Sequence, residues 1–241
     1  MPAEAVFVLL VRFRERQGLG HLDVLKNYKM LSNNILFTTF AAIKNRYMNK
    51  IKKTLLALFV AMSCSAMAQN AQNYLNIKAP ISFDGKDYKL GWSSHPAEYY
   101  YLEEFFPEGQ KPEHYDDMFS VSVVVADVEV SDLVMAKVRE LDERKKTDGC
   151  CNYQVLERKG GEVIIDFMVA AYENGKTSFV ESDIHHYKKI KLNGKPAVQL
   201  NFYSHRAYGD DIVPYFETLL KQKTDWIIKM GEMDIKVRLK Q

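Results

Sequence analysis

The sequence predicts an α+β domain in which an antiparallel sheet packs against two helices. Three observations indicate this class: strand-like segments come first, a helix-like segment covers about 131–146, and four further strand-like segments precede a second helix-like segment. Glycine-containing turns separate the later strands, which favours a meander, a run of sequentially paired strands. We detect no repeat, linker or low-complexity segment within 69–241, so we expect a single domain there.

The first strands are predicted from turn residues and alternation. Asp84-Gly85 separates two short apolar segments and is expected to form a hairpin turn. The aromatic segment 99–106 is expected to be a strand, followed by a polar loop over 107–116. Over 118–125, valines and phenylalanine alternate with serines, which predicts a strand buried on one face.

Capping residues and apolar stripes predict the helices. Ser131 is expected to cap the first helix, because its hydroxyl can accept a hydrogen bond from an N–H group of the first turn. Asp210 or Asp211 is expected to cap the second helix. The segment 235–241 alternates apolar and basic residues and is expected to form a short edge strand. The expected inner stripes are Val134, Val138 and Leu141, and Ile212, Phe216, Leu219 and Leu220, with Trp226 and Ile227 as an extension.

The four later strands form the predicted meander. They cover 153–158, 162–172, 177–191 and 197–204. Asn174-Gly175 and Asn193-Gly194 supply the positive φ angles that a type I′ turn requires. Pairing the last two strands around Asn193-Gly194 places His186 opposite Asn201, His185 opposite Phe202, and Ser182 opposite His205.

Residues 48–68 have the layout of a secretory signal peptide. Lysines follow Met48, a short apolar run comes next, and Ala66 and Ala68 form a small-residue cleavage site before Gln69. A membrane anchor is the first alternative, but the apolar segment has only 15 residues, whereas a spanning helix needs about 20. A lipoprotein signal with Cys64 as the modified residue is the second alternative, and the segment before Cys64 fits it less well.

The predicted signal peptide changes how the chain is divided. Residues 1–47 precede it, and we interpret them as an extension from an early start codon, with Met48 as the true first residue. The mature chain is then 69–241, a periplasmic or secreted domain of 173 residues with no stable membrane span. That length suffices for a single core.

Removing residues 1–68 reverses the sign of the net charge. They contain 10 of the 33 Lys and Arg residues and 3 of the 31 Asp and Glu residues. The full chain carries +2, whereas residues 69–241 have 23 basic and 28 acidic residues and carry −5. We therefore expect no nucleic-acid partner, since such proteins need a basic surface.

Only Cys150 and Cys151 remain after cleavage, and they are adjacent. Neighbouring Cα atoms lie about 3.8 Å apart, whereas ordinary disulfides need about 4.4 Å or more. We expect one buried and one exposed thiol; a strained vicinal disulfide and an intermolecular bridge are the alternatives.

His186 and His205 are the candidate metal ligands. The predicted register places both on one face of the sheet, more than one cross-strand step apart, with Asp183 on the other face. Two ligands do not complete a metal site, so we predict no metal and no cofactor. The sequence also shows no nucleophile motif and no phosphate-binding glycine loop.

Aromatic side chains are the better candidates for ligand binding. Tyr99 and Tyr101 lie on one face of the predicted strand and can contact a ligand or partner unless the C-terminal helix covers them. The adjacent acidic pairs are expected to be solvated charge. These pairs are Glu103-Glu104, Asp116-Asp117 and Asp210-Asp211.

The arrangement resembles the PsbP/Mog1-like fold over about residues 75–230. Two segments carry the resemblance: Glu104-Phe105-Phe106-Pro107-Glu108-Gly109, and Asn193-Gly194-Lys195-Pro196-Ala197-Val198. The chain departs from it at Tyr115, where a tryptophan is expected. The resemblance implies a binding or assembly-factor domain and supplies no catalytic residues.

The sequence therefore favours an exported, non-catalytic binding or accessory domain for an unknown protein or small ligand. The alternative is a periplasmic metal-dependent enzyme with a site near His186 and His205.

Overall fold

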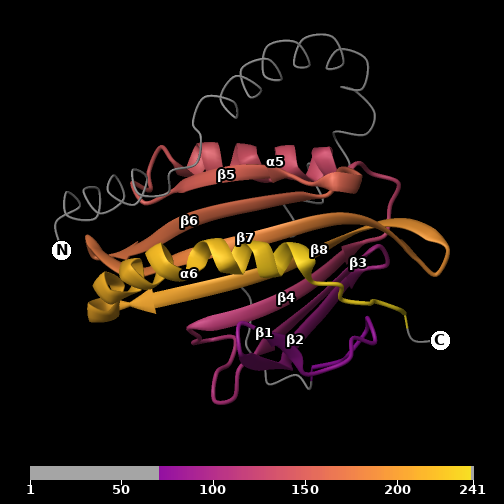
Figure 1. Cartoon of the computed structure of the whole chain (residues 1–241), viewed down its shortest axis with the longest axis horizontal. Helices are drawn as coiled ribbons and strands as arrows, with labels where there is room; N and C mark the ends of the chain where they lie inside the picture. The colour runs from indigo at the N-terminus through magenta and orange to yellow at the C-terminus, as the bar shows by residue number, and fades with distance from the viewer. Residues whose placement is uncertain (1–70, 240–241) are drawn as a thin grey trace, which may run out of the picture. The chain divides into compact units, whose positions relative to one another are not determined.

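The computed structural model describes residues 71–239, which form an eight-stranded, curled antiparallel sheet with two helices (Figure 1). This confirms the predicted α+β class. The strands are β1 (Ile81–Phe83), β2 (Lys86–Ala97), β3 (Tyr100–Phe106), β4 (Asp117–Val124), β5 (Asn152–Glu157), β6 (Val163–Glu173), β7 (Lys176–Leu192) and β8 (Lys195–Tyr208). The helices are α5 (Val130–Arg144) and α6 (Ile212–Glu232), and two short 3₁₀ segments are η1 (Lys159–Gly161) and η2 (Gly209–Asp211).

Two meanders meet at the centre of the sheet. The strand order is β1-β2-β3-β4-β8-β7-β6-β5, so β4 pairs with β8 and α5 carries the chain between the two halves. Asn174, Gly175, Asn193 and Gly194 all have positive φ angles, at 51°, 74°, 49° and 80°. These angles confirm the predicted turns, because a type I′ turn needs φ above zero at both central residues.

The helices pack on opposite faces of the sheet. Residues on the inner side of α5 join Ile165, Phe167 and Tyr187 in one apolar cluster. On the other face α6 contacts His186 and His205, and Figure 1 shows α6 lying along β7 and β8. We call these the α5 face and the α6 face. Side chains of neighbouring strand residues point to opposite faces, so each strand contributes to both.

The helix boundaries correct the predicted caps. Helix α5 begins at Val130, with Glu129 in the N-cap position, so Ser131 lies inside the first turn and does not cap the helix. The helix ends at Arg144 rather than near Lys146. Asp211 does occupy the N-cap position of α6, but its side chain makes no capping hydrogen bond there because η2 leads directly into the helix.

Burial of β4 corrects a second prediction. Ser120 and Ser122 are as buried as the apolar residues between them, so β4 is buried on both faces. Alternation suggested one solvated face, but β4 is a central strand and the sheet curls around it.

The two cysteines and the C-terminal segment also differ from expectation. Cys150 and Cys151 are both buried and both free, so the expectation of one exposed thiol is wrong; Cys151 belongs to the apolar cluster under α5. The segment 233–239 is not a strand, although the Arg238 N–H donates a hydrogen bond to the Leu75 carbonyl over 2.8 Å. The described helices include none that is long and apolar enough to cross a membrane. The predicted signal peptide and its cleavage site at Ala66, Ala68 and Gln69 lie outside the described residues.

Candidate functional site

An open pocket of about 320 Å³ lies beside the end of β8, where β4 begins and η2 leads into α6. We call it the His205 pocket. It contains one of the candidate site residues from the sequence and several side chains that the sequence did not single out. Its lining residues are Lys86, Gln110, Asp116, Asp117, His205, Arg206, Ala207, Tyr208, Asp211 and Tyr215.

The centre of the pocket is an aspartate–histidine pair. Asp117 is the first residue of β4 and lies directly opposite His205 of β8. His205 Nδ1 lies 2.9 Å from Asp117 Oδ1, and the Tyr203 hydroxyl donates to the same oxygen over 2.7 Å. Lys86 donates to the other carboxylate oxygen over 2.5 Å. Directly opposed residues of antiparallel strands share a face, which is why two residues 88 positions apart meet here.

These contacts keep Asp117 ionised although it is only 1% exposed. Burial alone raises the pKa of this carboxyl group, but the bonds from His205, Lys86 and Tyr203 outweigh burial and lower the pKa to about 2. The carboxylate occupies Nδ1 of His205, so Nε2 is the ring nitrogen left for a ligand. Aromatic rings hold the imidazole in place: Tyr215 stacks on it at 5.2 Å, and Trp226 meets it edge-on at 5.1 Å.

The rim of the pocket carries carboxylates. Asp116 and Asp211 are exposed, and the Gln110 side-chain oxygen accepts hydrogen bonds from the backbone N–H groups of Asp116 and Asp117, both over 2.9 Å. Arg206 also lines the pocket, but its guanidinium group pairs with Glu181. The rim therefore offers a ligand the carboxylate oxygens of Asp116 and Asp211.

The predicted register is confirmed, and it keeps the two candidate histidines apart. His186 lies opposite Asn201, His185 opposite Phe202 and Ser182 opposite His205. His186 is 1% exposed, with Nδ1 3.1 Å from the Met230 carbonyl oxygen and Nε2 2.8 Å from Glu162 Oε2. Burial lowers the pKa of His186 and Glu162 opposes that effect. His186 thus ties β7 to α6, and each histidine has its own carboxylate.

Residues 71–239 contain no group of three or more His, Cys, Asp or Glu side chains placed to hold a metal ion. Asp183 lies on the opposite face from His186, as the register predicts.

The two candidate tyrosines have different environments. Tyr99 is 39% exposed, whereas Tyr101 is 9% exposed. The ring of Tyr101 stacks on His95 of β2 at 4.1 Å, and Tyr74 lies against both rings. Neighbouring aromatic rings, rather than α6, cover Tyr101 in these contacts.

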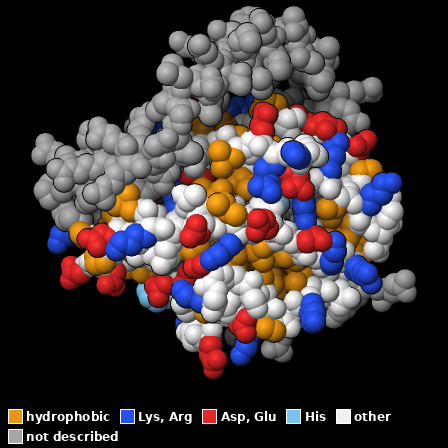
Figure 2. Space-filling view, in the orientation of Figure 1, with side chains coloured by type: hydrophobic (Ala, Val, Ile, Leu, Met, Phe, Trp, Pro, Cys, Tyr) orange, Lys and Arg blue, Asp and Glu red, His pale blue; other side chains and the backbone are white. Residues whose placement is uncertain are grey.

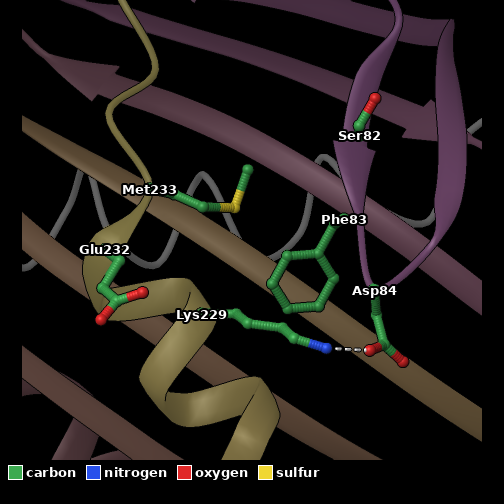
Figure 3. A pocket seen from close by; sticks show the side chains of 6 residues that line it. All are labelled: Ser82, Phe83, Asp84, Lys229, Glu232 and Met233. Carbon is green, nitrogen blue, oxygen red and sulfur yellow. Dashed lines mark hydrogen bonds and ion pairs between the residues drawn. The ribbon is translucent and has the colours of Figure 1, made fainter.

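A second hollow of about 250 Å³ lies where α6 meets the β1–β2 hairpin, and Figure 3 shows its lining. Lys229 and the Trp226 indole N–H both donate to Asp84, over 2.5 and 2.6 Å. Glu232 and Met233 complete the lining beside Phe83. Asp84 therefore fastens the hairpin to the helix, and we interpret its contacts as structural.

Sequence reasoning missed Asp117 and Lys86. Asp117 belongs to one of the acidic pairs expected to be solvated. Burial shows that this expectation is wrong for Asp117 and Glu103, whereas Asp116, Asp210 and Asp211 are exposed. The predicted β8 segment also ended at Ser204, one residue before His205, and the strand continues to Tyr208. The sequence did not show that β4 pairs with β8, and this pairing is what places Asp117 beside His205.

A protein-family model matches residues 75–235. The chain belongs to this family. The matched segment extends from Leu75 to Ile235, so the family region includes both helices and the whole described sheet. A search of the curated proteins finds no match.

Proposed function

We propose that this protein is an exported, non-catalytic binding or accessory domain and that its ligand occupies the His205 pocket. The observation that carries the proposal is the arrangement of Asp117, His205 and Lys86 in an open hollow. A buried, ionised carboxylate fixes the imidazole, and the stacked Tyr215 ring restricts its rotation. The site is thus preorganised, which reduces the entropic cost of binding.

The polar groups of the pocket favour a ligand that brings hydrogen-bond donors. In the tautomer whose Nδ1–H donates to Asp117, His205 Nε2 is an acceptor, and Asp116 and Asp211 add carboxylate oxygens at the rim. Hydroxyl and amino groups satisfy such acceptors, whereas a carboxylate or phosphate would meet two acidic side chains. We therefore propose a small polar ligand that carries hydroxyl or amino groups.

The absence of an adjacent nucleophile supports a binding role over acyl or phosphoryl transfer. A histidine–aspartate pair activates a serine, threonine or cysteine only within hydrogen-bonding reach. The side chains that line the pocket include none of these three types. The resemblance to PsbP/Mog1-like domains and the signal-like segment 48–68 are further reasons to propose an exported accessory domain.

The distribution of charged side chains on the face drawn in Figure 2 favours a small ligand over a nucleic acid. Figure 2 shows acidic and basic side chains intermixed on the face in view. The described residues on this face form no extended basic stripe for a nucleic-acid backbone.

Histidine-selective NMR tests the proposal. We expect ethanolamine or glucose to shift the ring resonances of His205 in the purified protein, while those of His95, which stacks on Tyr101 outside the pocket lining, stay unchanged and acetate shifts neither. The matched variants are Asp211→Asn, which alters the pocket rim, and Asp210→Asn, which alters an exposed neighbour outside the lining. Weaker binding in Asp211→Asn alone supports the site. Equal effects of the two variants, or a response to acetate only, would contradict it.

A further inference from the structure

The edge of the sheet at β5 lacks the features that usually keep strand edges from pairing. In the strand order, β1 and β5 are the two end strands. At the β1 end, β2 extends past the short β1, but it contains lysines, Pro96 and register shifts against β3. Short edge strands, lysine, proline and irregular pairing all hinder the addition of another strand. Strand β5 has six residues, none of them lysine or proline, and it pairs with β6 without a register shift.

The backbone of β5 points hydrogen-bonding groups away from the sheet. The Arg158 N–H, directly after the strand, donates to the Glu162 carbonyl over 2.9 Å and so continues the pairing with β6. In an antiparallel ladder, residues that bond to one neighbouring strand alternate with residues whose N–H and C=O groups point the other way. The N–H and C=O groups of Val155 and Glu157 therefore point outward, where no other strand of residues 71–239 pairs with β5.

Two opposite charges lie beside this edge on the α5 face. Tyr153 packs against the apolar cluster under α5, and Glu157 shares its face because the two are four residues apart in the strand. Lys145, directly after α5, places its Nζ 4.0 Å from the centre of the Tyr153 ring. Glu157 and Lys145 are both exposed, and neither forms an ion pair within the described residues, whereas the residues next to them do.

We propose that β5 is a dimerisation strand, which pairs antiparallel with β5 of a second copy of this chain around a two-fold axis at Val155. Such an axis, perpendicular to the sheet, places residues equally far from Val155 opposite each other and on the same face. Val155 then exchanges N–H and C=O hydrogen bonds with Val155 of the second copy. Glu157 lies opposite Tyr153 of the second copy, so its carboxylate reaches Lys145 there, and the symmetry forms this ion pair twice.

Charge complementarity favours a second copy over an unrelated strand, because the two exposed charges of this edge satisfy each other only in the symmetric pair. The register is also defined. An axis at Gln154 would place Glu157 opposite Cys151, whose N–H already donates to the Asp148 carbonyl over 3.0 Å. Helix α5 packs mainly on β6 and β7, so it leaves the outer edge of β5 accessible. The His205 pocket lies at β4 and β8, so this inference does not depend on the proposed ligand site.

Sedimentation velocity of the purified protein from about 1 to 100 µM tests the proposal, and we expect a dimer whose fraction rises with concentration. Glu157→Lys and Lys145→Glu should each weaken dimerisation by about tenfold or more, because each turns two attractive contacts into two repulsive ones. The double variant Glu157→Lys/Lys145→Glu should restore the dimer. Glu173→Lys, at an exposed glutamate at the end of β6, is the matched control and should leave dimerisation unchanged.

Val155→Pro tests the backbone pairing separately. It removes an N–H that points away from β6, so the variant should keep the circular dichroism spectrum of the parent protein and lose the dimer. A monomer at every concentration, equal effects of Glu157→Lys and Glu173→Lys, or a double variant that stays monomeric would overturn the proposal. A dimer that persists in folded Val155→Pro would show that another surface forms it.

Discussion

Two buried aspartates on opposite faces of the same sheet have pKa values that are shifted in opposite directions. Asp117 on the α6 face and Asp183 on the α5 face are 1% and 3% exposed. Asp117 receives bonds from His205, Tyr203 and Lys86, and its pKa falls to about 2. Asp183 has no cation of its own, and burial raises its pKa.

The comparison shows that burial alone does not determine the charge of a buried carboxyl group. Desolvation disfavours the ionised form on both faces, and only the partners differ. Lys86 lies on the hairpin next to the pocket and is half-exposed, so it can neutralise Asp117 while remaining partly hydrated. On the α5 face, Arg206 is already paired with Glu181.

The largest expected effect is a difference in the free energy of unfolding between variants at the two aspartates. Asp117→Ala removes the acceptor of three side chains and should lower the free energy of unfolding by about 3 kcal/mol. Asp183→Asn keeps the shape of a group whose ionised form burial disfavours, and should change the free energy of unfolding by less than about 1 kcal/mol. Urea denaturation at pH 6 measures both, with exposed Asp116→Ala as the control. Equal losses at the two positions would refute the comparison.

The pH dependence of stability should have opposite signs on the two faces. The pKa of Asp117 is about 2 in the folded protein against an ordinary 3.8, so its contribution of about 2 kcal/mol is present above pH 3.8 and is lost as the pH falls through 2. The pKa of Glu104 is raised from 4.5 to about 7, so its contribution is present below pH 4.5 and is lost as the pH rises towards 7.

Unfolding at pH 5 and pH 7.5 isolates the Glu104 effect. Glu104→Gln removes the titrating group, so the variant should gain stability relative to the parent protein between these two pH values. Glu108→Gln, at an exposed glutamate in the loop after β3, is the control and should keep the pH profile of the parent protein. A Glu104→Gln profile parallel to that of the parent protein would show that Glu104 titrates normally.

A smaller loss of folding stability is expected when the contact between the β1–β2 hairpin and α6 is removed. Asp84→Ala removes the acceptor of the buried Trp226 indole and should cost about 1–2 kcal/mol. Glu232→Ala alters the same hollow without breaking a hydrogen bond between the residues drawn in Figure 3, and should cost less than about 0.5 kcal/mol. Thermal unfolding followed by tryptophan fluorescence compares the two. Similar shifts in both variants would show that Asp84 does not fasten the helix.

The smallest expected effect concerns metal on the α6 face. His186 and His205 share this face but bond to Glu162 and Asp117 respectively. We expect EDTA to leave the melting temperature unchanged and elemental analysis to find no stoichiometric zinc. Zinc at one equivalent per chain, lost in His205→Ala, would instead favour the metal-dependent enzyme.

Local sequence signals predicted much of the fold correctly. The Asn-Gly turns fixed the register of β7 and β8 to the residue, because a two-residue turn leaves one pairing for all the residues that follow. The aromatic strand β3 and the inner stripe of α5 also follow from local patterns. The helix caps were predicted less accurately. Ser131 has the right side chain for a cap, yet the chain becomes helical one residue earlier.

The candidate site could be predicted only in part. His205 was a candidate because the register predicted from Asn193-Gly194 placed it on the same face of the sheet as His186. Asp117 was not, because a sequence does not show that β4 and β8, separated by 70 residues, are neighbours in the sheet. The same long-range pairing buries Ser120 and Ser122, which alternation alone places in solvent.

The sequence by itself determined the order of the elements, their turns and the register of the last hairpin, since these depend on residues close together in the chain. Only the tertiary structure decided which carboxyl groups are charged. A pKa depends on burial and on the cations within a few ångströms, and for Asp117 and Asp183 those surroundings come from distant segments.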